Sequence, residues 1–252
     1  MIVTVNTKNR NIQPVTISAP PSKSVAHRLL ILAALADKPS QLIRRGTSDD
    51  IERTADCLNS MGAEIVRLDN SDVISVKPLQ KPYISKCTLN VGESGSTLRF
   101  LIPVLGALGI SAEIHMAGRL PDRPLEPLAS ELISHGMSIG KTVREVLNVS
   151  GQLAPGKYTI DGGVSSQYIS GLLFALPMLG DSEIDITGNI ESLPYIEMTV
   201  DVLNLFGNHP KNTGHVYIIT DKGFVSNGIQ TVEGDYSGAA FMLCAGALTE
   251  TA

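Results

Sequence analysis

Leu58-Asn59-Ser60-Met61-Gly62 ends an amphipathic stretch of the chain. The same Leu-x-x-x-Gly form recurs at Leu132–Gly136 and at Leu203–Gly207. The three glycines are spaced by 74 and 71 residues. A fixed spacing of this size is typical of an internal repeat, in which each unit is one supersecondary structure. We therefore expect about seventy residues to form one structural unit that is used three times.

Two other markers recur with nearly the same period. A glycine closes a short β-like run in each unit, and a serine-bearing segment precedes each apolar run. The glycines are Gly46, Gly118 and Gly188, and the serines are Ser22/Ser24, Ser94/Ser96, Ser165/Ser166 and Ser237. Because three independent markers share one phase, chance agreement is a poor explanation.

Each unit then follows one order of elements. A stretch that is apolar on nearly every side predicts a buried helix, at Val25–Ala36, Thr97–Leu108 and Tyr168–Leu179. A short strand is expected next, at Gln41–Arg44, Ala112–Met116 and Glu183–Thr187. Helical spacing then predicts an amphipathic helix, marked by Ile51, Ala55 and Leu58, by Leu125, Leu128 and Leu132, and by Ile196, Val200 and Leu203.

A pair of strands joined by a turn closes each unit, as in Glu64–Leu68 with Val73–Val76. The sequence thus predicts a βαβαββ pattern repeated three times, in the α/β (α+β) class. Such units bury most of their apolar surface if the apolar helices pack together in parallel and the sheets lie outside. We expect residues 20–234 to form this domain, residues 1–19 to be a lead-in strand, and residues 235–252 to begin a second domain.

The composition narrows the class of protein. The chain has 252 residues, of which 43% are hydrophobic, and a formal net charge of −5. A hydrophobic fraction of this size predicts a packed core, and an acidic balance argues against a nucleic-acid partner. No segment has the length of a membrane span or the form of a signal peptide, so we expect a cytoplasmic protein. The separated Cys57, Cys87 and Cys244 are interpreted as buried, reduced thiols rather than a disulfide framework or a zinc site.

Unusual polar residues gather at the starts of the predicted buried helices. Ser22-Lys23-Ser24 and Arg28 open the first, Gly92 to Arg99 opens the second, and Ser165-Ser166-Gln167 opens the third. Helix N-termini present free N–H groups and a positive dipole end, and arginine adds a bidentate cation. Pro124 is expected to start a helix with Arg123 at its mouth.

These helix starts occupy the same phase of each repeat. In parallel packing they would converge at one end of the domain and form a single basic site within an acidic protein. The sequence therefore predicts a small, polyanionic, hydroxylated substrate. Walker A, GxSxG and HExxH patterns are absent, so nucleotide, acyl-serine and zinc chemistry are not favoured.

The ordered set of motifs resembles the 3-phosphoshikimate 1-carboxyvinyltransferase (EPSP synthase) family across essentially the whole chain. The motifs are Ser22-Lys23-Ser24-x-x-x-Arg28, Gly92-x-Ser94-Gly95-x-x-x-Arg99, Asp122-Arg123-Pro124, Val164-Ser165-Ser166-Gln167-Tyr168, Pro194-Tyr195-Ile196 and Val232-Glu233-Gly234-Asp235. The resemblance implies an α/β prism of two similar domains, each made of three βαβαββ units. It also implies transfer of the enolpyruvyl group of phosphoenolpyruvate to the 5-hydroxyl of shikimate 3-phosphate, with no cofactor or metal.

The resemblance also implies a role for each matched residue. Lys23, the catalytic candidate, would lie between both ligands, and Ser24 and Arg28 would hold the shikimate carboxylate. Further substrate contacts would come from Ser165, Ser166 and Ser192 with Tyr195 at the 3-phosphate, from Gln167 at both substrates, and from Gly95 and Arg123 at phosphoenolpyruvate, with Arg99 in support. Asp235 would mark the crossover into the second domain.

Two features depart from the family pattern. Glu93 stands where many members have asparagine, and its charge would weaken the phosphoenolpyruvate site unless a base pairs with it. The family's second domain supplies the principal acid/base carboxylate, and we expect that domain to be largely missing here. The chain is therefore expected to bind substrate and to be inactive alone.

Two other functions stay open. The sister enzyme that acts on UDP-N-acetylglucosamine shares this fold but usually has a reactive cysteine near Arg123, and Gly118 to Pro127 contains none. A non-catalytic half-domain that binds a complementing second domain, or that associates with itself, is the other alternative.

Overall fold

The computed structural model describes residues 18–68 and 71–249. Most of the expected lead-in strand lies outside these residues, as does part of the turn after Leu68. The helices are α1 (Lys23–Leu35), α2 (Asp49–Ser60), α3 (Gly95–Leu108), α4 (Leu128–Ser134), α5 (Ser166–Ala175), α6 (Leu193–Leu205) and α7 (Tyr236–Thr249), with 3-10 turns η1 (Leu120–Asp122) and η2 (Leu176–Met178). The strands are β1 (Ser40–Ile43), β2 (Glu64–Arg67), β3 (Val73–Lys77), β4 (Lys86–Gly92), β5 (Ser111–Met116), β6 (Met137–Ile139), β7 (Val146–Gly151), β8 (Lys157–Asp161), β9 (Ser182–Thr187), β10 (Lys211–Asn212), β11 (Val216–Ile219) and β12 (Ile229–Thr231).

The strands form three four-stranded sheets of one topology, in the orders β12-β1-β3-β2, β4-β5-β7-β6 and β8-β9-β11-β10. In each sheet the first two strands are parallel, and the remaining pairs are antiparallel. A helix connects β4 to β5 and β8 to β9, as parallel pairing requires. The mixed α/β class and the threefold βαβαββ plan are confirmed.

The first sheet obtains its parallel edge strand from the far end of the domain. Gln41 N–H donates to Gly228 O at 2.8 Å, and Val232 N–H donates to Ile43 O at 2.9 Å. The strand β12 is therefore the parallel neighbour of β1, as β4 is the parallel neighbour of β5 in the second sheet. This closure makes the three units equivalent although the chain enters the first of them at α1.

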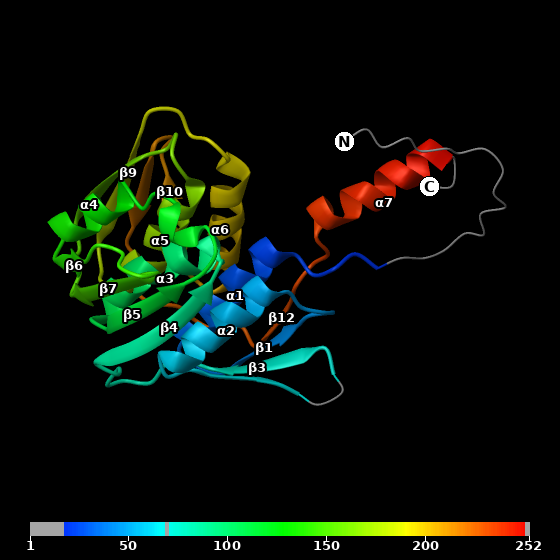
Figure 1. Cartoon of the computed structure of the whole chain (residues 1–252), viewed down its shortest axis with the longest axis horizontal. Coiled ribbons are helices and arrows are strands. Elements are labelled where there is room, and N and C mark those ends of the chain that lie inside the picture. Colours follow the sequence, from blue (N-terminus) through cyan, green and yellow to red (C-terminus); the bar gives the residue numbers. More distant parts are fainter. Residues whose placement is uncertain (1–17, 69–70, 250–252) are drawn as a thin grey trace.

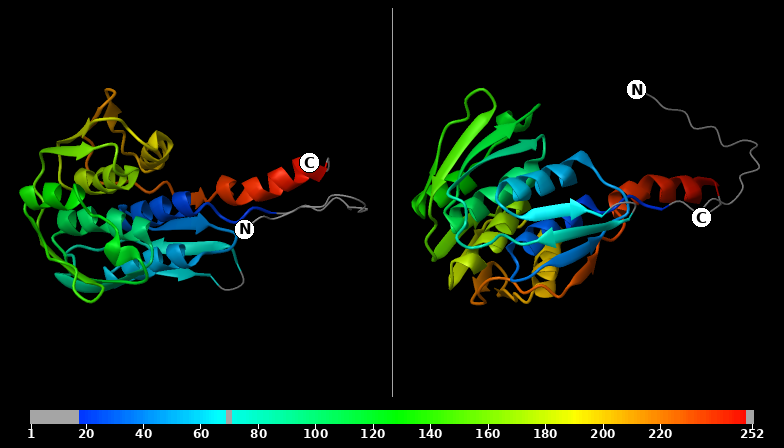
Figure 2. Two further views of the ribbon diagram at one scale, coloured as in Figure 1. Left: turned by 45° about the horizontal axis from the view of Figure 1, so that its top comes forward. Right: turned by 90° about the horizontal axis from the view of Figure 1, so that it is seen from below.

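The apolar helices α1, α3 and α5 lie inside, with the sheets around them (Figures 1 and 2). Phe100 on α3 joins the three helices, because its ring contacts His27 of α1 and Phe174 of α5 edge-to-face, with centroids 6.4 and 5.4 Å apart. Gly171 allows α5 to approach α3 closely, since a Cβ there would lie 2.5 Å from the backbone oxygen of Arg99. Helices that are apolar all round are stable only in such a buried position.

Two expectations about element boundaries are wrong. The second amphipathic helix begins at Leu128 instead of Pro124, and Leu125 precedes it. Pro127 is the residue before that helix, and Arg123 has an extended backbone after η1, so Arg123 is not at a helix mouth. The third buried helix ends as α5 at Ala175, and Pro177 continues it only as the 3-10 turn η2, because proline removes a helical N–H donor.

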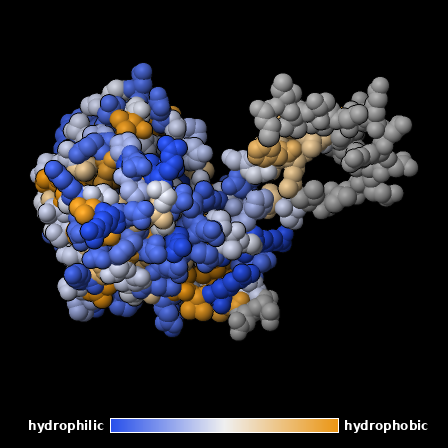
Figure 3. Space-filling view, viewed as in Figure 1, coloured by the Kyte–Doolittle hydropathy of each residue, from blue (hydrophilic) through white to orange (hydrophobic). Residues whose placement is uncertain are grey.

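The helix α7 extends away from the body that the sheets enclose (Figure 1). Its exposed side chains include Phe241, Leu243 and Leu248, and apolar atoms of α7 stand out beside the mostly polar body (Figure 3). Cys244 on this helix is exposed, so the prediction of burial is wrong for that cysteine and confirmed for Cys57 and Cys87. Within the described segments, no helix combines the length and the apolar composition needed to cross a bilayer.

Candidate functional site

Serines begin the helices that surround the candidate site. The hydroxyls of Ser22, Ser94 and Ser165 accept N–H bonds from Val25, Thr97 and Gln167, and so cap α1, α3 and α5. These caps satisfy one N–H each and leave the other first-turn N–H groups available.

Ser192 precedes α6 and differs from the three capping serines. Its backbone is in the left-handed region, with φ 57° and ψ 37°, and its side chain makes no capping hydrogen bond. A non-glycine residue is strained in this region, and such strain is concentrated at binding sites. The hydroxyl of Ser192 therefore stays available to a ligand.

A cavity of about 390 Å³ lies where the first turns of α1, α5 and α6 meet. The structure brings eight of the predicted site residues together around it: Lys23, Ser24, Arg28, Ser165, Ser166, Gln167, Ser192 and Tyr195. Ser96, Phe100 and Val164 complete the lining. The expected convergence of the buried-helix starts is present, because the first turns of α1, α3 (through Ser96) and α5 all line the cavity, and the start of α6 adds a fourth.

Arg28 is the buried cation of this cavity. Its Nε donates to Thr199 Oγ1 at 2.8 Å, its Nη1 to Ser24 O at 2.7 Å, and its Nη2 to Tyr195 O at 2.8 Å. The guanidinium also lies over the Phe100 ring, 5.2 Å from the centroid. Burial lowers the pKa of Arg28 to about 10, partly offset by Tyr195, so the side chain stays charged at neutral pH.

Arg99 connects this cavity to a second one. Its Nη1 donates to Gln167 Oε1 at 3.0 Å, and its Nη2 donates to Pro124 O at 3.2 Å. Gln167 Nε2 donates in turn to Ser96 Oγ at 2.9 Å, which fixes the orientation of the amide. The Nε of Arg99 is buried and has no partner.

Arg123 lines the second cavity, of about 310 Å³, with Arg119, Asp122 and Pro124. Gly95 lies beside Arg99 and Arg123, because a Cβ added to it would be 2.6 Å from Arg99 Nη1 and 3.3 Å from Arg123 Nη1. The structure therefore divides the predicted residues between two cavities, with Arg99 between them.

Lys23 and Glu93 differ in their pairing. Lys23 Nζ lies 2.8 Å from Asp50 Oδ2 at the first turn of α2, in a partly exposed ion pair. The described ion pairs do not include Glu93, whose carboxylate lies beside Gly118. Within the part of the chain that the structure describes, Glu93 thus forms no ion pair that would compensate its charge.

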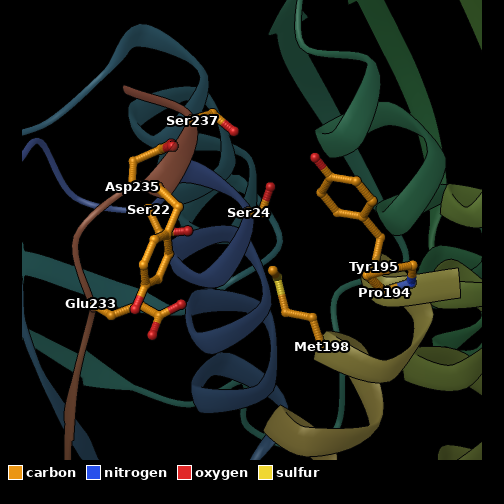
Figure 4. Close-up of a pocket in the computed structure, with 9 residues that line it drawn as sticks. Ser22, Ser24, Pro194, Tyr195, Met198, Glu233, Asp235 and Ser237 are labelled. Carbon is orange, nitrogen blue, oxygen red and sulfur yellow. The ribbon is translucent and has the colours of Figure 1, made fainter. Parts of the chain in front are cut away.

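A smaller cavity, of about 220 Å³, adjoins the first one and shares Ser24 and Tyr195 with it. Figure 4 shows Tyr195 and Met198 of α6 on one side and Ser24 of α1 on the other, near the segment that carries Glu233 and Asp235. This cavity joins the candidate site to the start of α7. In the described part of the chain, His, Cys, Asp and Glu side chains form no group that could hold a metal ion.

The family model for EPSP synthase (3-phosphoshikimate 1-carboxyvinyltransferase) matches residues 8–252. The chain belongs to the EPSP synthase family. It is 39% identical over 244 residues to a 3-phosphoshikimate 1-carboxyvinyltransferase of Clostridium kluyveri, and 37% identical over 243 residues to one of Clostridium beijerinckii. Each alignment covers 92% of this chain and 55% of the relative.

The chain has the same fold as part of a solved structure of EPSP synthase from Acinetobacter baumannii, with a TM-score of 0.75 at 24% identity. The match covers 92% of this chain and 53% of the other. The chain therefore spans about half the length of the EPSP synthases it matches, and its fold corresponds to half of their inside-out α/β fold.

Motif matching missed several residues around the site of this EPSP synthase family member. Thr199 and Ser170 lie behind Arg28, and Ser96 holds the amide of Gln167. A signal was present for Ser170, whose hydroxyl lies in a mostly apolar stretch of α5, whereas α6 around Thr199 also carries Glu197 and Asp201. No pattern in the sequence connects these residues, since Thr199 lies 171 residues from Arg28 and 29 residues from Ser170.

Proposed function

We propose that this chain binds shikimate 3-phosphate and forms part of the phosphoenolpyruvate site of an EPSP synthase. The overall reaction transfers the enolpyruvyl group of phosphoenolpyruvate to the 5-hydroxyl of shikimate 3-phosphate and releases phosphate. On its own the chain binds substrate without turning it over. The proposal extends family membership to a specific activity and to named residues.

The observation that carries the proposal is a set of arginines whose described partners are not carboxylates. The ion pairs of the described residues do not involve Arg28, Arg99 or Arg123, and Arg28 and Arg99 are buried. A buried guanidinium with only neutral partners is costly, and a bound anion offsets that cost. Two carboxylates and two phosphates, as in the proposed substrates, provide such anions.

The residues around the larger cavity suit shikimate 3-phosphate. Arg28 and Ser24 would hold its carboxylate, while hydroxyls and N–H groups at the helix starts would hold its phosphate. The phosphate contacts are assigned to Ser165, Ser166, Ser192 and Tyr195, and Gln167 is assigned to both substrates.

The smaller set around Arg123 suits phosphoenolpyruvate. Gly95 lets the ligand approach the backbone, Arg123 supplies charge, and Arg99 supports both from the protein interior. Lys23 would lie between the two substrates, where its cation stabilises negative charge on the phosphate that leaves.

The chemistry requires two proton transfers. As C3 of phosphoenolpyruvate gains a proton, the 5-hydroxyl loses its proton and its oxygen bonds to C2. The tetrahedral intermediate then loses a proton from C3 and expels phosphate, which restores the double bond. Among the side chains that line the larger cavity, Lys23 and Tyr195 can exchange a proton, and we assign one of the transfers to Lys23. The second group is expected to come from the other half of a full-length enzyme.

We also assign residues 20–234 to the substrate-binding domain, and residues 1–19 and 235–252 to a second domain. The exposed apolar side chains of α7 support this division, because they favour association with a complementing domain or with another copy. Size-exclusion chromatography with light scattering tests the division. A strictly monomeric chain at high concentration contradicts self-association.

Isothermal titration with shikimate 3-phosphate tests the binding half of the proposal. We expect saturable heat that Arg28→Ala abolishes and that Ser166→Ala reduces, the latter providing a milder variant if removal of the buried arginine unfolds the chain. No heat at millimolar ligand from the folded wild type overturns the proposal.

A phosphate-release assay with both substrates tests the activity half. The chain alone is expected to give no turnover, because the second proton-transfer group and the closed cavity are lacking. Brisk turnover would contradict the proposed division of labour between the two halves.

A further inference from the structure

Two hydroxyl groups occupy unusual positions in the core. Ser170 is in the middle of α5 and Thr199 is in the middle of α6, and both side chains are fully buried. Serine and threonine are weaker helix formers than alanine or leucine, and a buried hydroxyl needs partners. Alanine and valine would fit the apolar surroundings better, so these hydroxyls require another explanation.

The hydrogen bonds of Thr199 lead to Arg28. Thr199 Oγ1 accepts from Arg28 Nε at 2.8 Å, lies 2.7 Å from Ser170 Oγ, and lies 2.9 Å from Tyr195 O. A hydroxyl has one proton and two lone pairs. When Thr199 donates to Tyr195 O, Ser170 must donate to Thr199, and the hydrogen-bonding capacity of Thr199 is then filled.

This arrangement determines which edge of Arg28 remains free. The guanidinium has five N–H groups, and three of them donate to Thr199, Ser24 and Tyr195. The remaining N–H groups are one on Nη1 and one on Nη2. Two parallel N–H groups on the terminal nitrogens fit the two oxygens of a carboxylate.

We propose that Thr199 is a positioning residue for Arg28 and that Ser170 holds Thr199 in place. Thr199 accepts from the Nε edge of the guanidinium, which leaves the terminal edge for the carboxylate of the ligand. The choice of ligand rests on the proposed function, whereas the contact between Thr199 and Arg28 does not. Because Tyr195 O also accepts from Arg28, the plane of the guanidinium is tied to the first turn of α6, where Ser192 and Tyr195 line the cavity.

The first experiment needs no ligand. In ¹⁵N-edited NMR spectra of the 252-residue chain, the Arg28 Nε–H resonance is expected to exchange slowly with water, because it is buried and hydrogen-bonded. Thr199→Val keeps the shape of the side chain and removes the acceptor, so exchange should become at least about tenfold faster. Thr199→Ser should restore the slow exchange, and Ser170→Ala should have an intermediate effect.

The second experiment measures affinity for shikimate 3-phosphate and for its methyl ester, which lacks the carboxylate charge. Thr199→Val is expected to weaken binding of the acid about tenfold and binding of the ester by less than about threefold, because only the acid uses the fork of Arg28. Thr54→Val is the matched control. Thr54 is equally buried and bonds to His27 and Thr97 instead of Arg28, so its removal should leave both affinities unchanged.

The outcomes separate this inference from the proposed function. Unchanged exchange of the Arg28 Nε–H in a folded Thr199→Val variant overturns the positioning role, whatever the ligand does. Equal losses for the acid and the ester overturn the link to the carboxylate. Absence of binding by the wild type, with fast exchange in Thr199→Val, contradicts the proposed function and leaves the positioning contact established.

Discussion

His27 and Arg28 are neighbours on α1, and both are buried, but they adopt different charge states. Burial lowers the pKa of His27 to about 4, with Lys23 and Arg28 adding to the effect and Asp50 opposing it. His27 is therefore neutral at pH 7, with Nδ1 bonded to Thr54 Oγ1 at 2.6 Å. Arg28 stays charged because its intrinsic pKa is far higher.

The state of His27 predicts a pH dependence of stability. The ordinary pKa of 6.5 applies to the unfolded chain, which therefore binds a proton between pH 6.5 and 4 that the folded chain does not. The free energy of unfolding should thus fall as the pH falls through this window, by about 2 kcal/mol between pH 7 and pH 5 from this group. Urea denaturation at both pH values measures the loss.

His27→Asn is the control for this prediction, because asparagine can face Thr54 and cannot titrate. The variant should lose about 2 kcal/mol less than the wild type over the same pH interval, since the other titrating groups are shared. Identical losses in the two proteins would mean that His27 does not stay neutral in the folded state.

At the scale of elements, the repeat period predicted the order and type of helices and strands, because each unit packs one apolar helix inside and one sheet outside. The start of α4 could not be predicted so well. Pro124 fits the first position of a helix, yet the helix begins only at Leu128. The local backbone preference of proline favours a helix that begins at Pro124. The position of α4 is instead decided by Leu128 and Leu132, which are fully buried.

Gly171 gives a test at the same scale. Gly171→Ala places a Cβ 2.5 Å from the backbone oxygen of Arg99, so α5 and α3 must move apart. We expect the free energy of unfolding to fall by about 1–3 kcal/mol, as for other overpacked cores.

The matched control for Gly171 is Gly140→Ala, at an exposed position where the added Cβ would be 3.4 Å from its nearest neighbour, Asn148 O. Chemical denaturation measures the free energy of unfolding of both variants. A loss confined to Gly171→Ala indicates overpacking between α3 and α5, whereas a similar loss in both indicates a general effect of replacing glycine. Equal stabilities would show that the contact between α3 and α5 tolerates a methyl group.

At the scale of the whole molecule, the closing strand β12 was not predicted. Ile229–Thr231 is short and exposed on two of its three residues, so the sequence around it has no strong strand pattern. Its partner β1 lies almost 190 residues earlier in the chain. Pairing between strands this far apart in the chain depends on how the whole domain packs. A local sequence pattern does not contain that information.

Two truncations test this closure. A chain that ends at Asn227 lacks β12 and α7, whereas a chain that ends at Asp235 lacks only α7 and keeps the bonds between β12 and β1. The shorter chain should be less stable by several kcal/mol, because an edge of the first sheet loses its partner. Thermal unfolding of both chains tests whether β12 belongs to the fold. Equal unfolding midpoints for the two chains would contradict that role of β12.

The sequence also predicted which helix starts would meet, because the repeat places Ser22, Ser94 and Ser165 in one phase. It did not predict that Arg123 would face a separate cavity, since the turn around Arg123 depends on η1 rather than on a helix mouth.

The central claim is that distant segments of the chain form one anion site, and chemical-shift mapping with shikimate 3-phosphate tests it most directly. Backbone amide shifts are predicted at residues 23–28, 165–168 and 192–195 together, saturating with a single dissociation constant. Shifts limited to one of these segments, different dissociation constants among them, or no shifts at millimolar ligand would contradict a shared site.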